Sequence, residues 1–185
     1  MIQPWRQLSS RLLGDYRVFL VRQERKVSPR TGQEHDFFVI DCSNWVNVVA
    51  LTPDRQMILI EQFRHGSGTV ELEIPGGIID PADASPEAAG GRELTEETGY
   101  EGDKPVLVGQ VFPNPAIMRN HCYTVLVRNC RLVKPVDWDE GEDMATKLVP
   151  MEQVRELVAS GQIRHSLVVA ALYQFELWWK KNEGT

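Results

Sequence analysis

The sequence predicts a mixed α/β fold, namely an α/β/α sandwich around a mixed β-sheet, with extra antiparallel strands at the N-terminus. Strand-like segments recur from residue 16 to residue 149, while helix-like segments are few. The composition, 42% hydrophobic and 25% charged, is typical of a globular chain with a core. A length of 185 residues favours one main domain with a small appendage.

Apolar and β-branched runs bounded by turn residues predict the strands. The predicted strands cover residues 16–27, 35–41, 45–51, 56–63, 71–74, 106–112, 121–129 and, with a weaker pattern, 144–149. Turns rich in Pro and polar residues join the first two and the next two into hairpins. We therefore expect residues 1–44 to form an N-terminal β-hairpin region and residues 45–185 to form the main domain.

Start and stop signals predict three helices. Ser85 is a candidate N-cap with Pro86 at the first helical position, and Gly99 follows the end of this first helix. A second helix is expected after Pro150. A third is expected over residues 166–181, where apolar residues recur at helical spacing and indicate a core or dimer surface.

The distribution of charge excludes some functions. The net charge is −6, and residues 71–101 carry nine acids against one base, while residues 137–143 carry five acids and no base. Acid concentrated in two segments suggests cation binding, whereas a nucleic-acid groove needs a basic stripe, so no nucleic-acid partner is expected. The longest apolar run, residues 167–173, is far shorter than the roughly 20 residues of a membrane span.

Targeting and redox signals point to the cytoplasm. The N-terminal segment has no apolar region of the kind found in signal peptides. The three cysteines, Cys42, Cys122 and Cys130, form no CxxC pair and leave an odd one over. We therefore expect a cytoplasmic protein with reduced thiols and no membrane partner.

The first helix carries an unusual acidic face. Glu93, Glu96 and Glu97 stand at positions i, i+3 and i+4, so their carboxylates share one side of the helix and repel one another. A cation among them would relieve the repulsion, and oxygen ligands select Mg²⁺, Mn²⁺ or Ca²⁺ over zinc. The alternative is a solvated acidic face. Arg92, which can pair with Glu96, and the glycine pair 76–77, which allows close backbone approach, weigh against that alternative.

The segment PGGIIDPADASPEAAGGRELTEETGY resembles the Nudix box, G-x5-E-x7-R-E-U-x-E-E-x-G-U, in which U is a bulky apolar residue. Residues 92–99 match every defined position, and Tyr100 stands for the final apolar residue. In the first half, Asp83 stands where Glu is usual, and eight residues instead of seven separate it from Arg92. We interpret this as a one-residue insertion with Asp83 in the glutamate position; Ala84 is the alternative.

The resemblance extends to a Nudix subgroup that cleaves ADP-ribose and other nucleoside diphosphate sugars. It rests on Gln62-Phe63-Arg64 followed by residues 71–77, on Pro115, and on the acidic loop 139–143. It implies the Nudix fold and a Mg²⁺-dependent hydrolase, with Mn²⁺ as a possible substitute. The expected reaction splits a nucleoside diphosphate sugar into a nucleoside monophosphate and a sugar phosphate. ADP-ribose is the first-choice substrate, and GDP-mannose or another such hexose is the second.

The same resemblance implies roles for individual residues. Glu93, Glu97, Glu142 and the Gly76 carbonyl would bind metal, and Glu96 would bind metal or orient the attacking water. Glu140 would be the general base, with Glu142 or Glu96 as alternatives. The substrate would contact Arg64, Pro115 and Trp45. Structural alternatives stay open, because Arg64 can pair with Glu61 or Glu73, and Trp45, like Trp5, can be a core residue.

Two other functions remain as alternatives. One is a housekeeping nucleotide or RNA-end pyrophosphohydrolase, and the other is a catalytically inactive Nudix-fold nucleotide sensor. Sensors generally lose the box glutamates, whereas this sequence retains all three. The subgroup resemblance also implies a homodimer in which residues 1–44 exchange strands between protomers.

Overall fold

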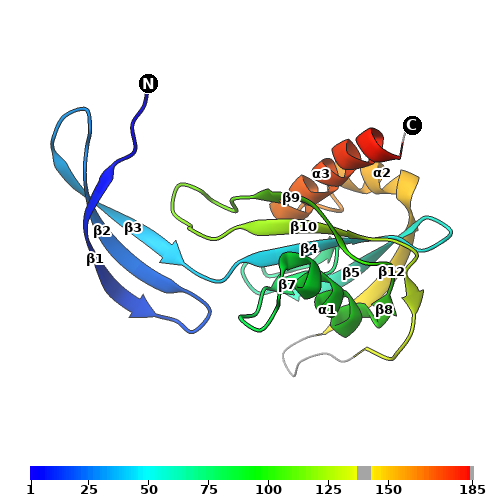
Figure 1. Ribbon diagram of the computed structural model, residues 1–185. Helices are drawn as coiled ribbons and strands as arrows, with labels where there is room; N and C mark the ends of the chain where they lie inside the picture. The colour runs from blue at the N-terminus through cyan, green and yellow to red at the C-terminus, as the bar shows by residue number, and fades with distance from the viewer. Residues whose placement is uncertain (137–142, 184–185) are drawn as a thin grey trace. The chain divides into compact units, whose positions relative to one another are not determined.

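A computed structural model describes residues 1–136 and 143–183 of the chain, which divides into two compact units. The N-terminal unit is Met1–Ser43 with Phe112–His121, and the main unit is Asn44–Val111 with Cys122–Thr185. The strands are β1 (Arg6–Asp15), β2 (Leu20–Val27), β3 (Glu34–Asp41), β4 (Trp45–Ala50), β5 (Gln56–Arg64), β6 (Thr69–Glu73), β7 (Gly76–Ile78), β8 (Tyr100–Glu101), β9 (Val106–Val111), β10 (Cys122–Val127), β11 (Arg131–Leu132) and β12 (Met144–Pro150) (Figure 1). The helices are α1 (Pro86–Thr98), α2 (Val154–Ala159), which follows the 3₁₀ turn η1 (Met151–Gln153), and α3 (Ser166–Asn182).

The N-terminal unit is an antiparallel sheet with the strand order β1-β2-β3. β1 was not predicted, because register shifts after Gln7 and after Leu12 interrupt the alternation of apolar and polar residues that marks a strand. The strand predicted over 16–27 begins only at Leu20. Residues 16–19 form a turn in which the Tyr16 amide donates to the Phe19 carbonyl at 3.0 Å.

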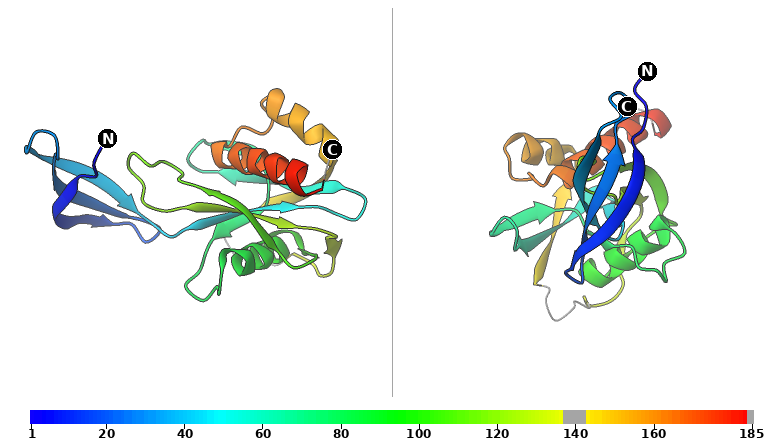
Figure 2. Two further views of the ribbon diagram at one scale, coloured as in Figure 1. Left: turned by 45° about the horizontal axis from the view of Figure 1, so that its top comes forward. Right: turned by 90° about the vertical axis from the view of Figure 1, so that its left-hand side faces the viewer.

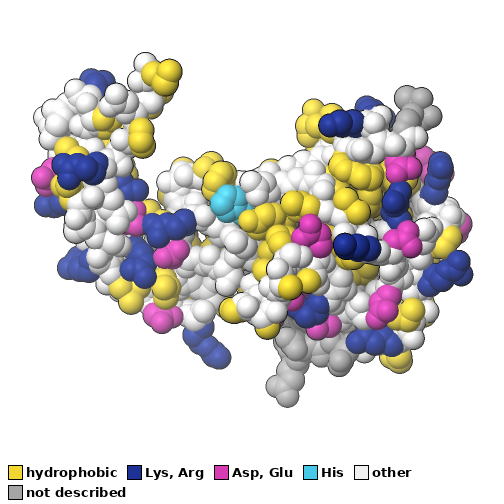
Figure 3. All heavy atoms as spheres, in the orientation of Figure 1, with side chains coloured by type: hydrophobic (Ala, Val, Ile, Leu, Met, Phe, Trp, Pro, Cys, Tyr) yellow, Lys and Arg dark blue, Asp and Glu magenta, His cyan; other side chains and the backbone are white. Residues whose placement is uncertain are grey.

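This unit has no apolar interior. All of its residues are described, and none of its hydrophobic side chains is buried. Figure 3 shows hydrophobic side chains at its surface, on the left of the view. The large exposed ones on its strands are Leu8, Leu12, Leu13, Phe37 and Phe38. A three-stranded sheet without a covered apolar face is marginal on its own.

The segment 112–121 belongs to the N-terminal unit although it follows β9 in the chain. The Ile40 amide of β3 donates to the Ile117 carbonyl at 2.7 Å, and the Arg119 amide donates back to the Ile40 carbonyl at 3.3 Å. The Arg119 side chain also forms an ion pair with Glu24 of β2, which is only 1% exposed. Backbone and charge together therefore attach this segment to β2 and β3.

The main unit confirms the predicted α/β/α arrangement. One sheet has the order β7-β4-β10-β9, with β4 and β10 parallel, and another has the antiparallel order β12-β5-β6. β8 and β11 form a separate short pair. Within this unit, α1 lies on one side of the strands and α3 on the other (Figures 1 and 2).

Two apolar clusters hold these layers together. Ala89 and Leu94 of α1 are buried against strand residues such as Val48, whereas Val168 and Phe175 of α3 are buried in the cluster on the opposite side. Of the two glycines within α1, Gly90 packs closely against β10. There, a Cβ would lie 3.3 Å from the Val125 side chain. Gly91 has only an ordinary contact, 3.5 Å from Pro105.

None of the helices in residues 1–136 and 143–183 is long and apolar enough to cross a membrane.

Candidate active site

Helix α1 begins and ends where the sequence predicts. The Ser85 hydroxyl accepts a hydrogen bond from the Ala88 amide at 3.2 Å, and Pro86 occupies the first turn. Gly99 ends the helix in the left-handed conformation, with φ of 74°, and its amide donates to the Thr95 carbonyl. These caps set the ends of the helix, and its buried residues Ala89 and Leu94 set which face is turned to the strands.

Glu97 and Glu93 lie against the backbone of β7. Glu97 is 3% exposed, and its Oε2 accepts a hydrogen bond from the Gly76 amide at 2.9 Å. A Cβ on Gly77 would lie 2.5 Å from Glu93 Oε1, and one on Gly76 would lie 2.2 Å from the Val46 carbonyl oxygen. The expectation of close approach to the helix is therefore confirmed at Gly77, while Gly76 lies close to β4 and contacts α1 through its amide.

Arg92 supplies positive charge to the acidic face. Its Nη1 donates to Glu93 Oε1 at 3.0 Å and to Glu96 Oε2 at 2.8 Å, so the predicted pairing with Glu96 is present. Its Nη2 donates to the Ile78 carbonyl at 3.0 Å. One guanidinium thus joins two helix carboxylates to the end of β7 and offsets part of their repulsion.

Asp83, which the sequence analysis assigns to the glutamate position of the box, is a partner of Arg92. It accepts hydrogen bonds from Arg92 Nε at 3.2 Å and from Nη2 at 2.9 Å, while its Oδ2 also accepts from the Asp80 amide at 2.9 Å. The hydrogen bonds from Arg92 hold the pKa of Asp83 below its ordinary value. The Asp83 carboxylate therefore connects the Arg92 guanidinium to the backbone of the loop before α1.

The donor set at this helix suits a hard divalent cation. Carboxylate oxygens of three glutamates are present, and the absence of a Cβ at Gly77 lets the Glu93 carboxylate lie against β7. Within residues 1–136 and 143–183, no group of three or more His, Cys, Asp or Glu side chains is arranged to hold a metal ion by itself. The other predicted participants, Glu140 and Glu142, lie outside the described residues. The described residues therefore provide part of an oxygen-donor set.

Arg64 forms the structural pair that the sequence left open. At the end of β5, its Nε and Nη2 donate to the two oxygens of Glu73 at 2.9 and 2.8 Å. Glu73 is 1% exposed, and its Oε2 also lies 2.8 Å from His165 Nδ1. Burial opposes ionisation of Glu73, but the hydrogen bonds from His165 and Arg64 outweigh it and lower the pKa to about 2.

The other two predicted substrate residues lie in different units. Trp45 begins β4, is half-buried, and stands opposite Cys122 of β10 and Ile78 of β7. Pro115 belongs to the segment 112–121 of the N-terminal unit.

The sequence offers Glu73 as one of two possible partners of Arg64, but it does not predict the contact between Glu73 and His165. The pairing with Glu73 has a signal in the sequence. Glu71 and Glu73 alternate on one strand, so both acids face the same way beside Arg64. No local signal points to His165, because it is 92 residues away from Glu73.

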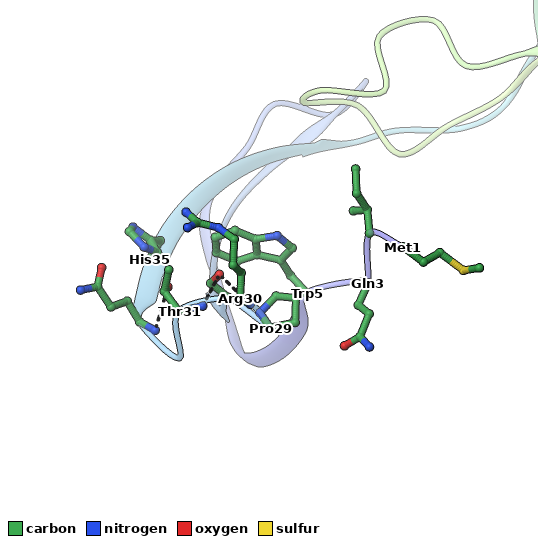
Figure 4. Close-up of a pocket in the computed structure, with 10 residues that line it drawn as sticks. Met1, Gln3, Trp5, Pro29, Arg30, Thr31 and His35 are labelled. Atoms are coloured by element: carbon green, nitrogen blue, oxygen red, sulfur yellow. Dashed lines mark hydrogen bonds between the residues drawn. The ribbon is translucent and has the colours of Figure 1, made fainter.

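The N-terminal unit contains a cavity of about 730 Å³ between its first residues and the β2–β3 turn. Figure 4 shows Trp5, Arg30 and His35 among the side chains that line it. The Trp5 ring meets His35 and Phe37 edge-on, with centroids 5.6 and 5.3 Å apart. Trp5 is therefore held within an aromatic group, at 40% exposure.

Comparison with known proteins gives a consistent set of matches. The model of the NUDIX domain matches residues 44–172. An ADP-sugar pyrophosphatase of Mus musculus is 36% identical over 65% of this chain, and the match spans 58% of the mouse protein. An ADP-ribose pyrophosphatase of Mycobacterium tuberculosis is 25% identical over 89% of this chain and 80% of its own length. The crystal structure of an ADP compounds hydrolase superposes with a TM-score of 0.86 at 20% identity, covering 100% of this chain and 99% of that one, and supports the fold.

Proposed function

Because this chain belongs to the NUDIX domain family, we propose that it hydrolyses the diphosphate of a nucleoside diphosphate sugar, with ADP-ribose as the first substrate. The observation that carries the proposal is the acidic face of α1, where Arg92 and the Gly76 amide hold three retained glutamates against β7. Relatives named ADP-sugar and ADP-ribose pyrophosphatases support the substrate class. GDP-mannose and other such hexoses are the second choice.

In this reaction, water attacks one phosphorus, the bridging oxygen leaves with the other phosphate, and the products are a nucleoside monophosphate and a sugar phosphate. The transition state gathers negative charge, and a bound divalent ion, Mg²⁺ or Mn²⁺, would supply charge neutralisation and acidify the attacking water. Glu93, Glu96, Glu97, the Gly76 carbonyl and Glu142 would hold that ion.

Residues of the chain would transfer the proton and bind the substrate. Glu140 would take the proton of the attacking water, with Glu142 or Glu96 as alternatives. Arg64 would bind the diphosphate, because a guanidinium matches phosphate oxygens in geometry and charge. Trp45 and Pro115 would contact the nucleoside or the sugar.

We also propose that the protein acts as a homodimer in the cytoplasm. The N-terminal unit has a sheet with exposed apolar side chains and no buried ones, so covering that sheet with a second copy would bury apolar surface. All three cysteines are free thiols, which fits a reducing compartment.

One experiment tests the reaction directly. The protein is incubated with ADP-ribose, GDP-mannose, UDP-glucose or a capped RNA, each with Mg²⁺ and with EDTA, in H₂¹⁸O, and the products are followed by ³¹P NMR. Metal-dependent cleavage of a nucleotide sugar is expected, and the ¹⁸O label identifies the phosphorus that is attacked. Tight binding of one of these compounds, with cleavage of none of them, would instead support the nucleotide-sensor function.

A further inference from the structure

Two buried carboxylates on β6 form a charged cluster outside the α1 site. Glu71 and Glu73 are 6% and 1% exposed, and each contacts a side chain from the segment just before α3, Arg164 or His165. Arg164 binds Glu71, while His165 and Arg64 bind Glu73. Buried carboxylates are costly unless they are paired and hydrogen-bonded, so the cluster depends on the two arginines and on the hydrogen bond from His165.

The hydrogen bonds of Glu73 hold the Arg64 guanidinium in place. Arg64 uses Nε and Nη2 on the two carboxylate oxygens, and His165 Nδ1 meets Oε2, the same oxygen that accepts from Nη2. A carboxylate only accepts hydrogen bonds, so Nδ1 carries the hydrogen and donates it. With a second donor on Oε2, the carboxylate plane is fixed, and the bidentate pair then fixes the guanidinium plane.

Exposure differs sharply between the members of this group. The Glu73 side chain is 2% exposed and that of Arg64 is 40% exposed. A buried carboxylate therefore holds an arginine side chain that reaches the surface. An arginine held this way has already lost much of its rotamer freedom, and a ligand that binds it pays less entropy.

The neighbouring pair offers a natural contrast. Arg164 donates to Glu71 with Nε at 2.9 Å and Nη2 at 2.8 Å, which also attaches the start of α3 to β6. Its side chain is 58% exposed, and its bonds go to Glu71, not to the carboxylate that holds Arg64. Docking of α3 and orientation of Arg64 are therefore carried by adjacent but separate ion pairs.

We infer that Glu73 and His165 are positioning residues, which hold the Arg64 guanidinium in one orientation to receive the diphosphate of the substrate. The inference rests on the proposed function, because it assigns Arg64 to substrate binding. It adds Glu73 of β6 and His165, the residue before α3, to the residues of the proposed site.

The test compares His165→Ala, His165→Asn and Arg164→Gln with the unchanged protein. For ADP-ribose with Mg²⁺, His165→Ala is expected to raise KM about tenfold while kcat stays within about twofold. Its Kd for the non-hydrolysable α,β-methylene analogue of ADP-ribose should rise by the same factor. His165→Asn should restore KM to within about threefold, because its amide nitrogen can donate near the position of Nδ1. Arg164→Gln should lower the melting temperature and leave KM unchanged.

The outcomes separate the inference from the proposed function. A KM in His165→Ala equal to that of Arg164→Gln would overturn the positioning role, because His165 would then serve only to dock α3. Failure of His165→Asn to restore KM would do the same. Absence of nucleotide-sugar cleavage by the unchanged protein would instead overturn the proposed function. Glu73→Gln gives a second variant, and it is expected to raise KM at least as much as His165→Ala.

Discussion

Asp83 accepts two hydrogen bonds from Arg92, at 3.2 and 2.9 Å, across the eight residues that separate them in the chain. The same guanidinium holds Glu93 and Glu96, so Asp83 orients the group that organises the acidic face of α1.

Removing Asp83 should loosen Arg92. For Asp83→Ala, we expect hydrolysis of ADP-ribose to fall about tenfold and the free energy of unfolding to fall by about 1–2 kcal/mol, since a charge-assisted pair is lost. Asp80→Ala is the control, because Asp80 is 3.8 Å from Arg92 and its side chain is 59% exposed. Steady-state kinetics measures the hydrolysis rate, and urea unfolding measures the free energy of unfolding. Equal effects in the two variants would contradict the role of Asp83.

Glu97 should matter for turnover far more than for stability. Glu97→Gln keeps an oxygen that can accept from the Gly76 amide but loses the negative charge, so kcat is expected to fall by about three orders of magnitude. The melting temperature without metal should change little. Glu101→Gln, at an exposed site on β8, is the control. Retention of activity in Glu97→Gln would show that the metal assignment is wrong.

A methyl group at residue 77 should displace a carboxylate. The Cβ of Gly77→Ala would lie 2.5 Å from Glu93 Oε1, so the Glu93 side chain must move and the concentration of Mg²⁺ needed for half-maximal activity should rise about tenfold. Gly66→Ala is the matched control, since nothing lies within 4 Å of its Cβ. The Mg²⁺ titration of activity is the measurement. An unchanged titration in Gly77→Ala would mean that Glu93 does not bind the ion.

Acid should destabilise the fold through Glu73. Its pKa is about 2 in the folded protein, below the ordinary 4.5, so its stabilisation is complete above pH 4.5 and is lost as the pH falls toward 2. Between pH 6 and pH 3, this amounts to about 2 kcal/mol. Urea unfolding at both values should therefore show a smaller loss for Glu73→Gln than for the unchanged protein. The same loss in both would show that Glu73 ionises normally in the fold.

The exposed sheet of the N-terminal unit should be covered in solution. Sedimentation at micromolar concentration is expected to give a dimer, and Leu12→Lys should shift it toward monomer by placing a charge on the apolar surface. Leu148→Lys, at a 44% exposed position on β12, tests whether any exposed leucine has this effect. A monomer for the unchanged protein would exclude the proposed assembly.

Local signals predicted much of the main unit. The Ser85 and Gly99 caps placed α1, and apolar runs placed β4, β5 and α3 to within a residue or two, because these elements are specified by residues within them. β1 escaped prediction because two register shifts break its alternation. β7 has only three residues, two of them glycine, and owes its pairing to Asn47 and its neighbours on β4.

In the site, too, features set by local sequence were predicted and contacts between distant residues were not. The acidic face of α1 and its pairing with Arg92 follow from helical spacing and were predicted. The hydrogen bond from His165 to Glu73 connects residues 92 positions apart, and a single sequence has no periodicity at that distance. Likewise, the attachment of residues 112–121 to β3 depends on tertiary structure.

That attachment has a consequence for synthesis on the ribosome. β1, β2 and β3 are translated first, but Glu24 acquires its Arg119 partner only 95 residues later. Until then, the carboxylate must remain hydrated, since burying it with Lys26 as its only cation would be costly. The nascent N-terminal sheet is therefore expected to stay open until Arg119 leaves the exit tunnel, which is after α1 has been translated.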